Sequence, residues 1–119
     1  MEFKTRKMIS HKDLNSNETL FGGRVLGWID EEAYIFSCCQ LATDKLVTRS
    51  MSRVNFIASA RRGDIIEIGM EIVKFGTTSI TFRCEVRNMR TEKIITKVDE
   101  IVFVNLGNDG KPKPHGKSA

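Results

Sequence analysis

The sequence predicts an α+β domain in which a strongly twisted antiparallel sheet wraps around one long buried helix. The most apolar part of the chain, residues 20–41, has helical spacing. From residue 46 onward apolar residues recur with a period of two, and short turn motifs separate the alternating segments. Because the helix and the strands are segregated along the chain, the pattern is typical of α+β rather than alternating α/β. A length of 119 residues fits a single domain.

The helical segment is apolar on nearly every side. One face carries Leu26, Ile29, Ala33 and Phe36, and much of the rest is covered by Val25, Trp28 and Ile35. A helix with this pattern is expected to be buried. The start of the helix is ambiguous, because Asp30, Glu31 and Glu32 would make a good N-cap and first turn. Taken alone, the pattern favours that cap.

Four later segments read as strands. Residues 64–74, 78–90 and 93–106 alternate clearly, and residues 46–56 do so more weakly. Residues typical of turns separate these segments at 61–64 and 75–77, and another turn motif follows the last segment at 108–110. We predict a sheet of about five strands, of which these segments supply four, in a domain spanning residues 13–107. Residues 1–12 are expected to be a polar lead-in, and residues 108–119 a basic, frayed tail.

Composition narrows the class of protein. The hydrophobic fraction of 40% and charged fraction of 29% are ordinary globular values, which argue against a disordered or collagen-like chain. No apolar run is long enough for a transmembrane helix. The cysteines, Cys38, Cys39 and Cys84, match no disulfide framework or common zinc pattern, so we expect buried structural thiols, no metal and a cytoplasmic location. The net charge of +4 favours anionic partners without naming one.

Several residues are candidates for chemistry, each with a plainer structural explanation. Asp30 is either a helix cap or a carboxylate whose apolar surroundings make it a general base. Gly22 and Gly23 form either a simple turn or a pair of amides that hold developing negative charge. Asn17 either orients a water or carbonyl or forms an Asx turn. The basic residues near turns either bind phosphate groups or form part of a solvated surface. They are Arg61, Arg62, Lys74, Arg87 and Arg90.

Taken in their order along the chain, these features resemble those of a known protein family. The run NETLFGGRVLGWIDE, residues 17–31, is similar to the signature of the single-domain hotdog acyl-coenzyme A thioesterases. Supporting matches follow at residues 54–56, 63–64, 74–79, 102–104 and 109–112. The resemblance covers about residues 13–114, nearly the whole chain.

The resemblance implies a hotdog fold and a helix that starts near Gly22, which puts Asp30 about two turns inside it. It implies that Asp30 is the catalytic carboxylate and that the backbone N–H of Gly23 polarises the thioester carbonyl. Asn17 would help to position substrate or water, and Thr48 would lie on a strand near the reacting centre. Family members form homodimers by joining two sheets edge to edge, often as trimers of dimers, with active sites at the dimer interface.

The resemblance also implies a substrate arm. Gly76, Thr77, Thr78 and Ser79 match a loop near coenzyme A, and Lys74 and Arg87 are candidates for its phosphates. The implied reaction is hydrolysis of acyl-coenzyme A, with Asp30 as general base or as the nucleophile of a mixed anhydride. No cofactor is required, since coenzyme A is part of the substrate and a product.

Other functions are less favoured by the residues. A non-catalytic acyl-coenzyme A-binding module stays open. A hotdog hydratase or dehydratase needs a core histidine, and no histidine lies between residues 12 and 114. Neither nucleic acid nor a membrane is expected as a partner, because the charge is modest and no row of exposed aromatics is evident.

Overall fold

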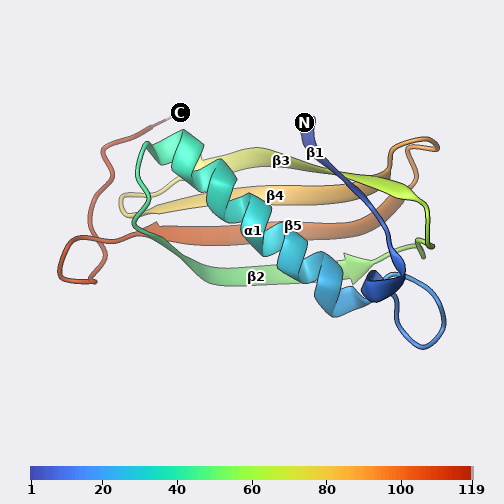
Figure 1. The fold of residues 1–119 in the computed structure, drawn as a ribbon. Helices are drawn as coiled ribbons and strands as arrows, with labels where there is room; N and C mark the ends of the chain where they lie inside the picture. The colour runs from blue at the N-terminus through green and yellow to red at the C-terminus, as the bar shows by residue number, and fades with distance from the viewer. Residues whose placement is uncertain (119) are drawn as a thin grey trace.

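The predicted arrangement of one helix against a five-stranded antiparallel sheet is confirmed (Figure 1). The computed structural model describes residues 1–118, so the last residue of the predicted tail lies outside the described part. The elements are β1 (Glu2–Met8), the short 3-10 helix η1 (His11–Asp13), α1 (Gly22–Leu41), β2 (Leu46–Phe56), β3 (Ile65–Phe75), β4 (Ser79–Asn88) and β5 (Ile94–Asn105). The strand order is β1-β3-β4-β5-β2, and all neighbours are antiparallel.

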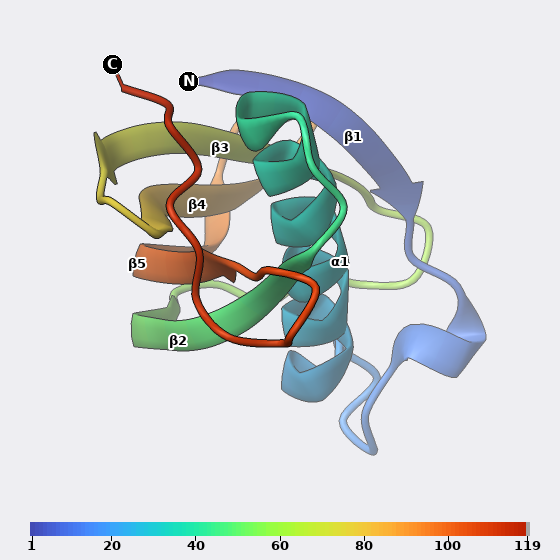
Figure 2. The same cartoon turned by 90° about the vertical axis from the view of Figure 1, so that its left-hand side faces the viewer.

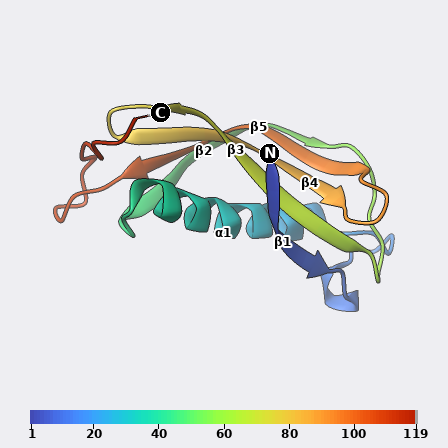
Figure 3. The ribbon, with the colours of Figure 1, turned by 90° about the horizontal axis from the view of Figure 1, so that it is seen from above.

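Helix α1 lies along one face of the curved sheet (Figure 3). It buries a single stripe at every fourth position, formed by Val25, Ile29, Ala33, Ser37 and Leu41. The expectation of a helix buried on all sides is wrong for the single chain, because Tyr34 and Ile35 on the far side are exposed. Within the described chain, no helix combines the length and hydrophobicity that crossing a membrane requires.

The helix begins at Gly22, with Phe21 as an N-cap residue that makes no side-chain capping bond. The interpretation of Asp30 as a cap is therefore wrong, and the start near Gly22 is confirmed. Tertiary hydrogen bonds position the segment before the helix: the Leu20 N–H donates to the carbonyl of Ala60, and the Phe21 N–H to the carbonyl of Asp13. A local capping pattern could not predict this start, because no capping side chain produces it.

The core lies between α1 and the inward faces of the central strands. The aromatic ring of Phe82 on β4 is fully buried, and its centroid lies 5.1 Å from the ring of Phe36 on α1 and 5.8 Å from that of Phe103 on β5. The other fully buried inward residues of these strands include Ile66, Ile80, Val86, Val98 and Ile101. This packing holds α1 rigidly against the sheet and so fixes the positions of its outward residues.

Residues 1–12 are more than the expected lead-in, since most of them form β1. This strand pairs with β3 along the edge of the sheet. Its side chains alternate between half-buried and exposed, and the ring of Phe3 packs so closely over Gly69 that a Cβ there would lie 2.8 Å from it. The sequence of this strand shows no alternation of apolar and polar residues, because only Phe3 on the half-buried side is strongly apolar.

The tail is also more ordered than expected. After β5 it turns back, and the Lys113 N–H donates to the Asn105 carbonyl at 2.9 Å. The Asn105 side-chain amide donates in return to the Lys113 carbonyl, also at 2.9 Å. Figure 2 shows the tail running across the ends of the strands toward the β3–β4 connection. The prediction of a frayed tail is therefore wrong for residues 111–115.

Strand β2 is the second edge of the sheet and pairs only with β5 among the described residues. The pairing shifts register between Thr48 and Ser50, where Arg49 is skipped. Arg53 has a positive φ of 58°, which is uncommon for a residue with a side chain. Val47 and Phe56, near the two ends of this strand, are large apolar side chains that stay exposed. The edge is therefore long, irregular and partly apolar.

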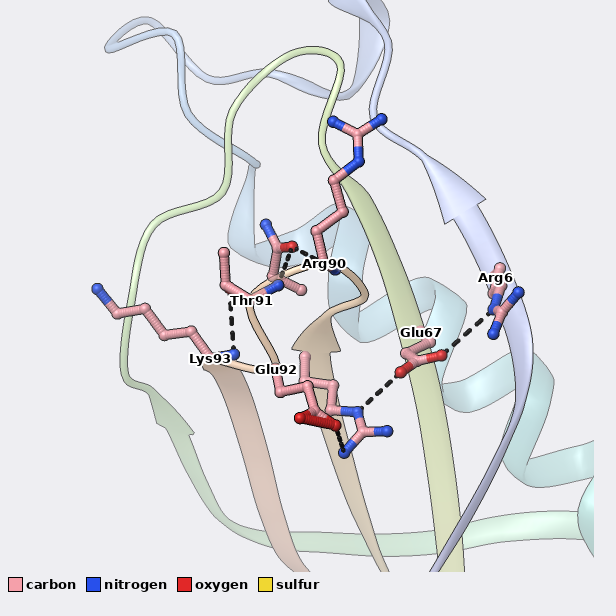
Figure 4. A network of polar contacts seen from close by, with 8 residues as sticks. Arg6, Glu67, Arg90, Thr91, Glu92 and Lys93 are labelled. Carbon is pink, nitrogen blue, oxygen red and sulfur yellow. Dashed lines mark hydrogen bonds and ion pairs between the residues drawn. The ribbon is translucent and has the colours of Figure 1, made fainter.

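A buried carboxylate ties three strands together (Figure 4). Glu67 on β3 is only 4% exposed, and its carboxylate accepts hydrogen bonds from Arg87 on β4 at 2.8 Å and Arg6 on β1 at 3.3 Å. The Arg87 guanidinium also lies 3.8 Å from the ring centre of Phe3. Burial acts to raise the pKa of Glu67, but the hydrogen bonds from the two arginines outweigh it, so the pKa is lowered.

We expect Glu67→Gln to lower the free energy of unfolding by about 1–3 kcal/mol, since it removes hydrogen bonds to a charged acceptor. Because the folded-state pKa is lowered, this contribution is present above the unfolded pKa of about 4.5 and is lost as the pH falls through the lower folded value. Urea unfolding of both proteins at pH 7 and near pH 3 measures it. The control is Glu71→Gln: Glu71 pairs with Arg83, both partners are about 40% exposed, and the cost should stay below about 1 kcal/mol. Equal losses for the two variants would contradict the prediction.

Candidate active site

Two of the predicted catalytic residues meet across the gap between α1 and β2. The hydroxyl of Thr48 donates to Oδ1 of Asp30 at 2.6 Å. Both residues are exposed, and the second carboxylate oxygen of Asp30 accepts no hydrogen bond from residues 1–118. A charge-assisted bond of this length holds the carboxylate in one orientation. The arrangement leaves one oxygen free to act on a water or an acyl group.

The predicted oxyanion donor lies in the first turn of the same helix. The N–H groups of Arg24 and Val25 both donate to the Phe21 carbonyl. The amides of Gly22 and Gly23, in contrast, find no backbone acceptor within the described chain. Unpaired amides at the positive end of a helix favour a developing negative charge. The geometry of Gly23 is therefore suited to polarising a carbonyl.

Gly23 and Asp30 of one chain do not converge on a single atom. They are seven residues apart on α1, which places them about 10 Å apart along the helix axis. A reacting carbonyl needs an attacking carboxylate or water within about 3–3.5 Å, while its oxygen contacts the donor. Within one chain, Gly23 and Asp30 therefore cannot act on the same carbonyl group.

Asn17 does not reach either group. Its side chain is exposed, and its backbone N–H donates to Oδ1 of Asn15 at 2.9 Å. Asn15, which was not predicted, is the asparagine that organises the loop, since its Oδ1 also accepts from the Thr19 N–H at 3.1 Å. It lines a cavity of about 400 Å³ together with Gly22 and Phe56. The sequence signal for this role is the Asx turn, in which a side chain binds backbone two residues onward.

Residues 76–79 form a tight connection between β3 and β4, as the turn motif at residues 75–77 predicts. The Gly76 N–H donates to the Ser79 carbonyl at 2.8 Å. A Cβ at position 76 would meet the hydroxyl of Ser79, so a larger residue there would force that hydroxyl to turn away. Lys74 is exposed two residues earlier, within reach of a ligand on this turn.

Arg87 does not join this turn. It lies eight residues after Ser79 on β4, or about 26 Å along an extended strand. Its guanidinium is engaged by Glu67 and, at 3.6 Å, by Glu92. Within one chain, Arg87 therefore contributes to stability rather than to a phosphate site beside Ser79.

Another cavity lies on a different side of α1. It measures about 460 Å³, has an apolar floor that includes Phe36, Ile68 and Met70, and lies between α1, β1 and β3. Glu32 on its wall accepts a hydrogen bond from Thr5 of β1 at 2.6 Å. None of the predicted catalytic residues lines it, so cavity size alone would point away from the Asp30–Thr48 pair.

The cysteines divide into two kinds. Cys84 is buried, and burial, followed by the nearby carboxylates of Glu85 and Glu32, raises its pKa to about 12. This thiol stays protonated at neutral pH and is not a nucleophile. Cys39, however, is exposed, so the prediction of buried structural thiols is wrong at that position. None of the three cysteines contacts Asp30 within the described chain.

A helix lying on a twisted five-stranded antiparallel sheet, with a carboxylate two turns inside the helix, is the hotdog arrangement. The chain belongs to the thioesterase superfamily, whose family model matches residues 17–95. It is 30% identical over 105 residues to YkhA of Bacillus subtilis, an uncharacterized acyl-CoA thioester hydrolase, covering 86% of this chain. It spans only 60% of that relative's length.

Solved structures agree with this placement. A hexameric acyl-CoA thioesterase in its apo form is 31% identical, with a TM-score of 0.83 over 92% of this chain and 72% of that one. An acyl-CoA hydrolase of Staphylococcus aureus, solved with butyryl coenzyme A and coenzyme A, is 27% identical. Its TM-score is also 0.83, over 92% of this chain and 66% of that chain. The predicted hotdog fold is therefore confirmed.

Proposed function

We propose that this protein hydrolyses acyl-coenzyme A thioesters to a free carboxylic acid and coenzyme A. The observation that carries the proposal is the Thr48–Asp30 hydrogen bond in a thioesterase-superfamily chain whose helix opens with two unpaired glycine amides. In the overall reaction the elements of water add across the C–S bond. The oxygen goes to the acyl carbon, and a proton ends on the departing sulfur.

Asp30 acts on the acyl carbon in one of two ways. As a general base it takes a proton from an attacking water, and as a nucleophile it forms a mixed anhydride that water then cleaves. Thr48 keeps the carboxylate oriented in both cases. The Gly23 amide stabilises the negative charge that develops on the carbonyl oxygen.

Variants of the S. aureus hydrolase support these assignments. An aspartate, an asparagine and a threonine of that protein have each been replaced by alanine in solved structures. The asparagine precedes the aspartate by fifteen positions, and the threonine follows it by seventeen. Here Asn15 precedes Asp30 by fifteen positions and Thr48 follows it by eighteen. We therefore infer that Asn15, rather than Asn17, is the polar residue that helps to shape the substrate site.

We further propose that a complete site needs two chains, with Asp30 from one copy and Gly23 from another. The 10 Å separation of these residues within one chain motivates this. The free edge of β2 and the exposed side chains of Phe21 and Phe56 supply a surface that a second copy would cover. The hexameric relative is consistent with dimers that assemble further into a trimer of dimers.

The coenzyme A arm is proposed to lie against the turn at residues 76–79. The backbone and hydroxyl groups of this turn would bind the pantetheine and phosphate groups of coenzyme A, with Lys74 as the nearby cation. The S. aureus relative, solved with coenzyme A bound, supports this class of ligand.

The test is release of free thiol from a panel of acyl-coenzyme A esters, from acetyl to palmitoyl. We expect turnover on part of the panel, with the best substrate reporting the depth of the acyl pocket. Tight binding of these esters without thiol release would instead identify a non-catalytic acyl-coenzyme A-binding module. If the folded protein neither binds nor hydrolyses any of these esters, the proposal is refuted.

A further inference from the structure

The C-terminal tail contacts the β3–β4 turn through His115. After its pairing with Asn105, the chain reaches residue 115, whose backbone N–H donates to the Thr77 carbonyl at 3.2 Å. The path is visible in Figure 2, where the tail crosses the strand ends and rises toward β3. The segment that was expected to fray is thus attached to the turn at residues 76–79.

The side chain of His115 makes the closest of these contacts. Its Nε2 lies 2.8 Å from the Ser79 carbonyl oxygen, and its Nδ1 accepts from the Lys117 N–H at 3.0 Å. A carbonyl only accepts, so Nε2 carries the hydrogen and Nδ1 is the acceptor. The ring also packs edge-on against Phe75, at 6.1 Å between centroids. Both ring nitrogens of His115 therefore form hydrogen bonds, and the ring also packs against Phe75.

Together these bonds orient the turn. The carbonyl of Thr77 binds the tail, that of Thr78 accepts from the Asn105 N–H at 2.8 Å, and that of Ser79 accepts from His115. The amides of Thr77 and Thr78 have no backbone acceptor among residues 1–118. The tail and β5 thus bind the carbonyls of Thr77 and Thr78, and the Ser79 carbonyl is shared between His115 and the Gly76 N–H, whereas the amides of Thr77 and Thr78 stay available to a ligand.

We propose that His115 is a positioning residue that holds this turn in the shape that binds the coenzyme A arm. The inference rests on the proposed function. His115 touches neither the acyl group nor Asp30, so it contributes to the binding of the arm and not to the chemical step. A substrate without the arm does not depend on it.

The experiment compares two thioesters of the same acyl group: the coenzyme A ester, and the N-acetylcysteamine ester, which lacks the nucleotide and most of the arm. Wild type, His115→Ala and His115→Gln are measured on both, since the glutamine amide can still donate to the Ser79 carbonyl. His11→Ala is the matched control, because that histidine lies in η1 and contacts no part of the turn. Direct binding of coenzyme A is measured in parallel by calorimetry.

For His115→Ala we expect KM for the coenzyme A ester and Kd for coenzyme A to rise about 2- to 10-fold, the value of one hydrogen bond. Its kcat should stay near wild type, its kinetics on the short ester should be unchanged, and His115→Gln should recover most of the affinity. Unchanged KM on both esters would overturn the inference, and so would an equal loss on both, which indicates a merely structural role. If wild type neither turns over nor binds coenzyme A, the proposed function itself fails and the inference fails with it.

Discussion

Asp30→Ala should lower kcat for the best acyl-coenzyme A ester by about 10²–10⁴, because it removes the positioned base or nucleophile. KM should change little, since the carboxylate acts on the reacting carbon and not on the arm. Thermal unfolding should stay close to wild type, because Asp30 is exposed and bonds only the Thr48 hydroxyl among the described side chains.

Two further variants sharpen this result. Asp30→Asn keeps an acceptor for the Thr48 hydroxyl but cannot accept a proton or form an anhydride, so it should be nearly as inactive as alanine. Glu31→Ala removes an exposed carboxylate one position away and should retain wild-type activity. If Asp30→Ala stays near wild type, or if Glu31→Ala is equally inactive, Asp30 is not the catalytic carboxylate.

Gly23→Pro should lower kcat/KM by about 10²–10³, the usual effect of losing one oxyanion donor. Proline removes the N–H of the second helical residue, where no intrahelical hydrogen bond is lost. A side chain at this position also meets the ring of Phe21, with a Cβ 2.8 Å from it, but that ring is 55% exposed and can turn away.

Gly23→Ala is the matched control, because it adds the same Cβ and keeps the N–H. We expect Gly23→Ala to lose much less activity than Gly23→Pro when both are measured under single-turnover conditions. Similar losses in the two variants would mean that the Phe21 ring, and not the amide, explains the requirement for glycine.

Periodicity predicted four of the five strands, the edge strand β2 included, and missed β1. The segments expected at residues 64–74, 78–90 and 93–106 correspond to β3, β4 and β5 within two residues at each end. These strands have one strongly apolar face, which a period of two detects directly. The signal is weak in β1, where Phe3 is the only strongly apolar residue on the half-buried side.

The site was predictable only in part, because its residues depend on contacts that no local pattern contains. Asp30 was first interpreted as a cap, since Asp-Glu-Glu is a good first turn. The true start depends on hydrogen bonds from Leu20 to Ala60 and from Phe21 to Asp13. The residue pattern made Asp30 and Gly23 candidates, the resemblance to a family assigned their roles and added Thr48, and the structure brings Asp30 and Thr48 together. No local pattern indicated His115, and its partners are evident only in the folded chain.

The irregular edge of β2 has a consequence for the newly made chain. A single folded chain presents β2 as a long unpaired strand, and such a strand can recruit foreign chains into aggregates. The register shift at Arg49 and the positive φ of Arg53 interrupt the row of backbone N–H and C=O groups along the edge of β2. Both residues also place a positively charged side chain on this edge strand. A straight foreign strand therefore finds only short stretches to pair with. The irregularities that distort this edge therefore make aggregation through β2 less favourable.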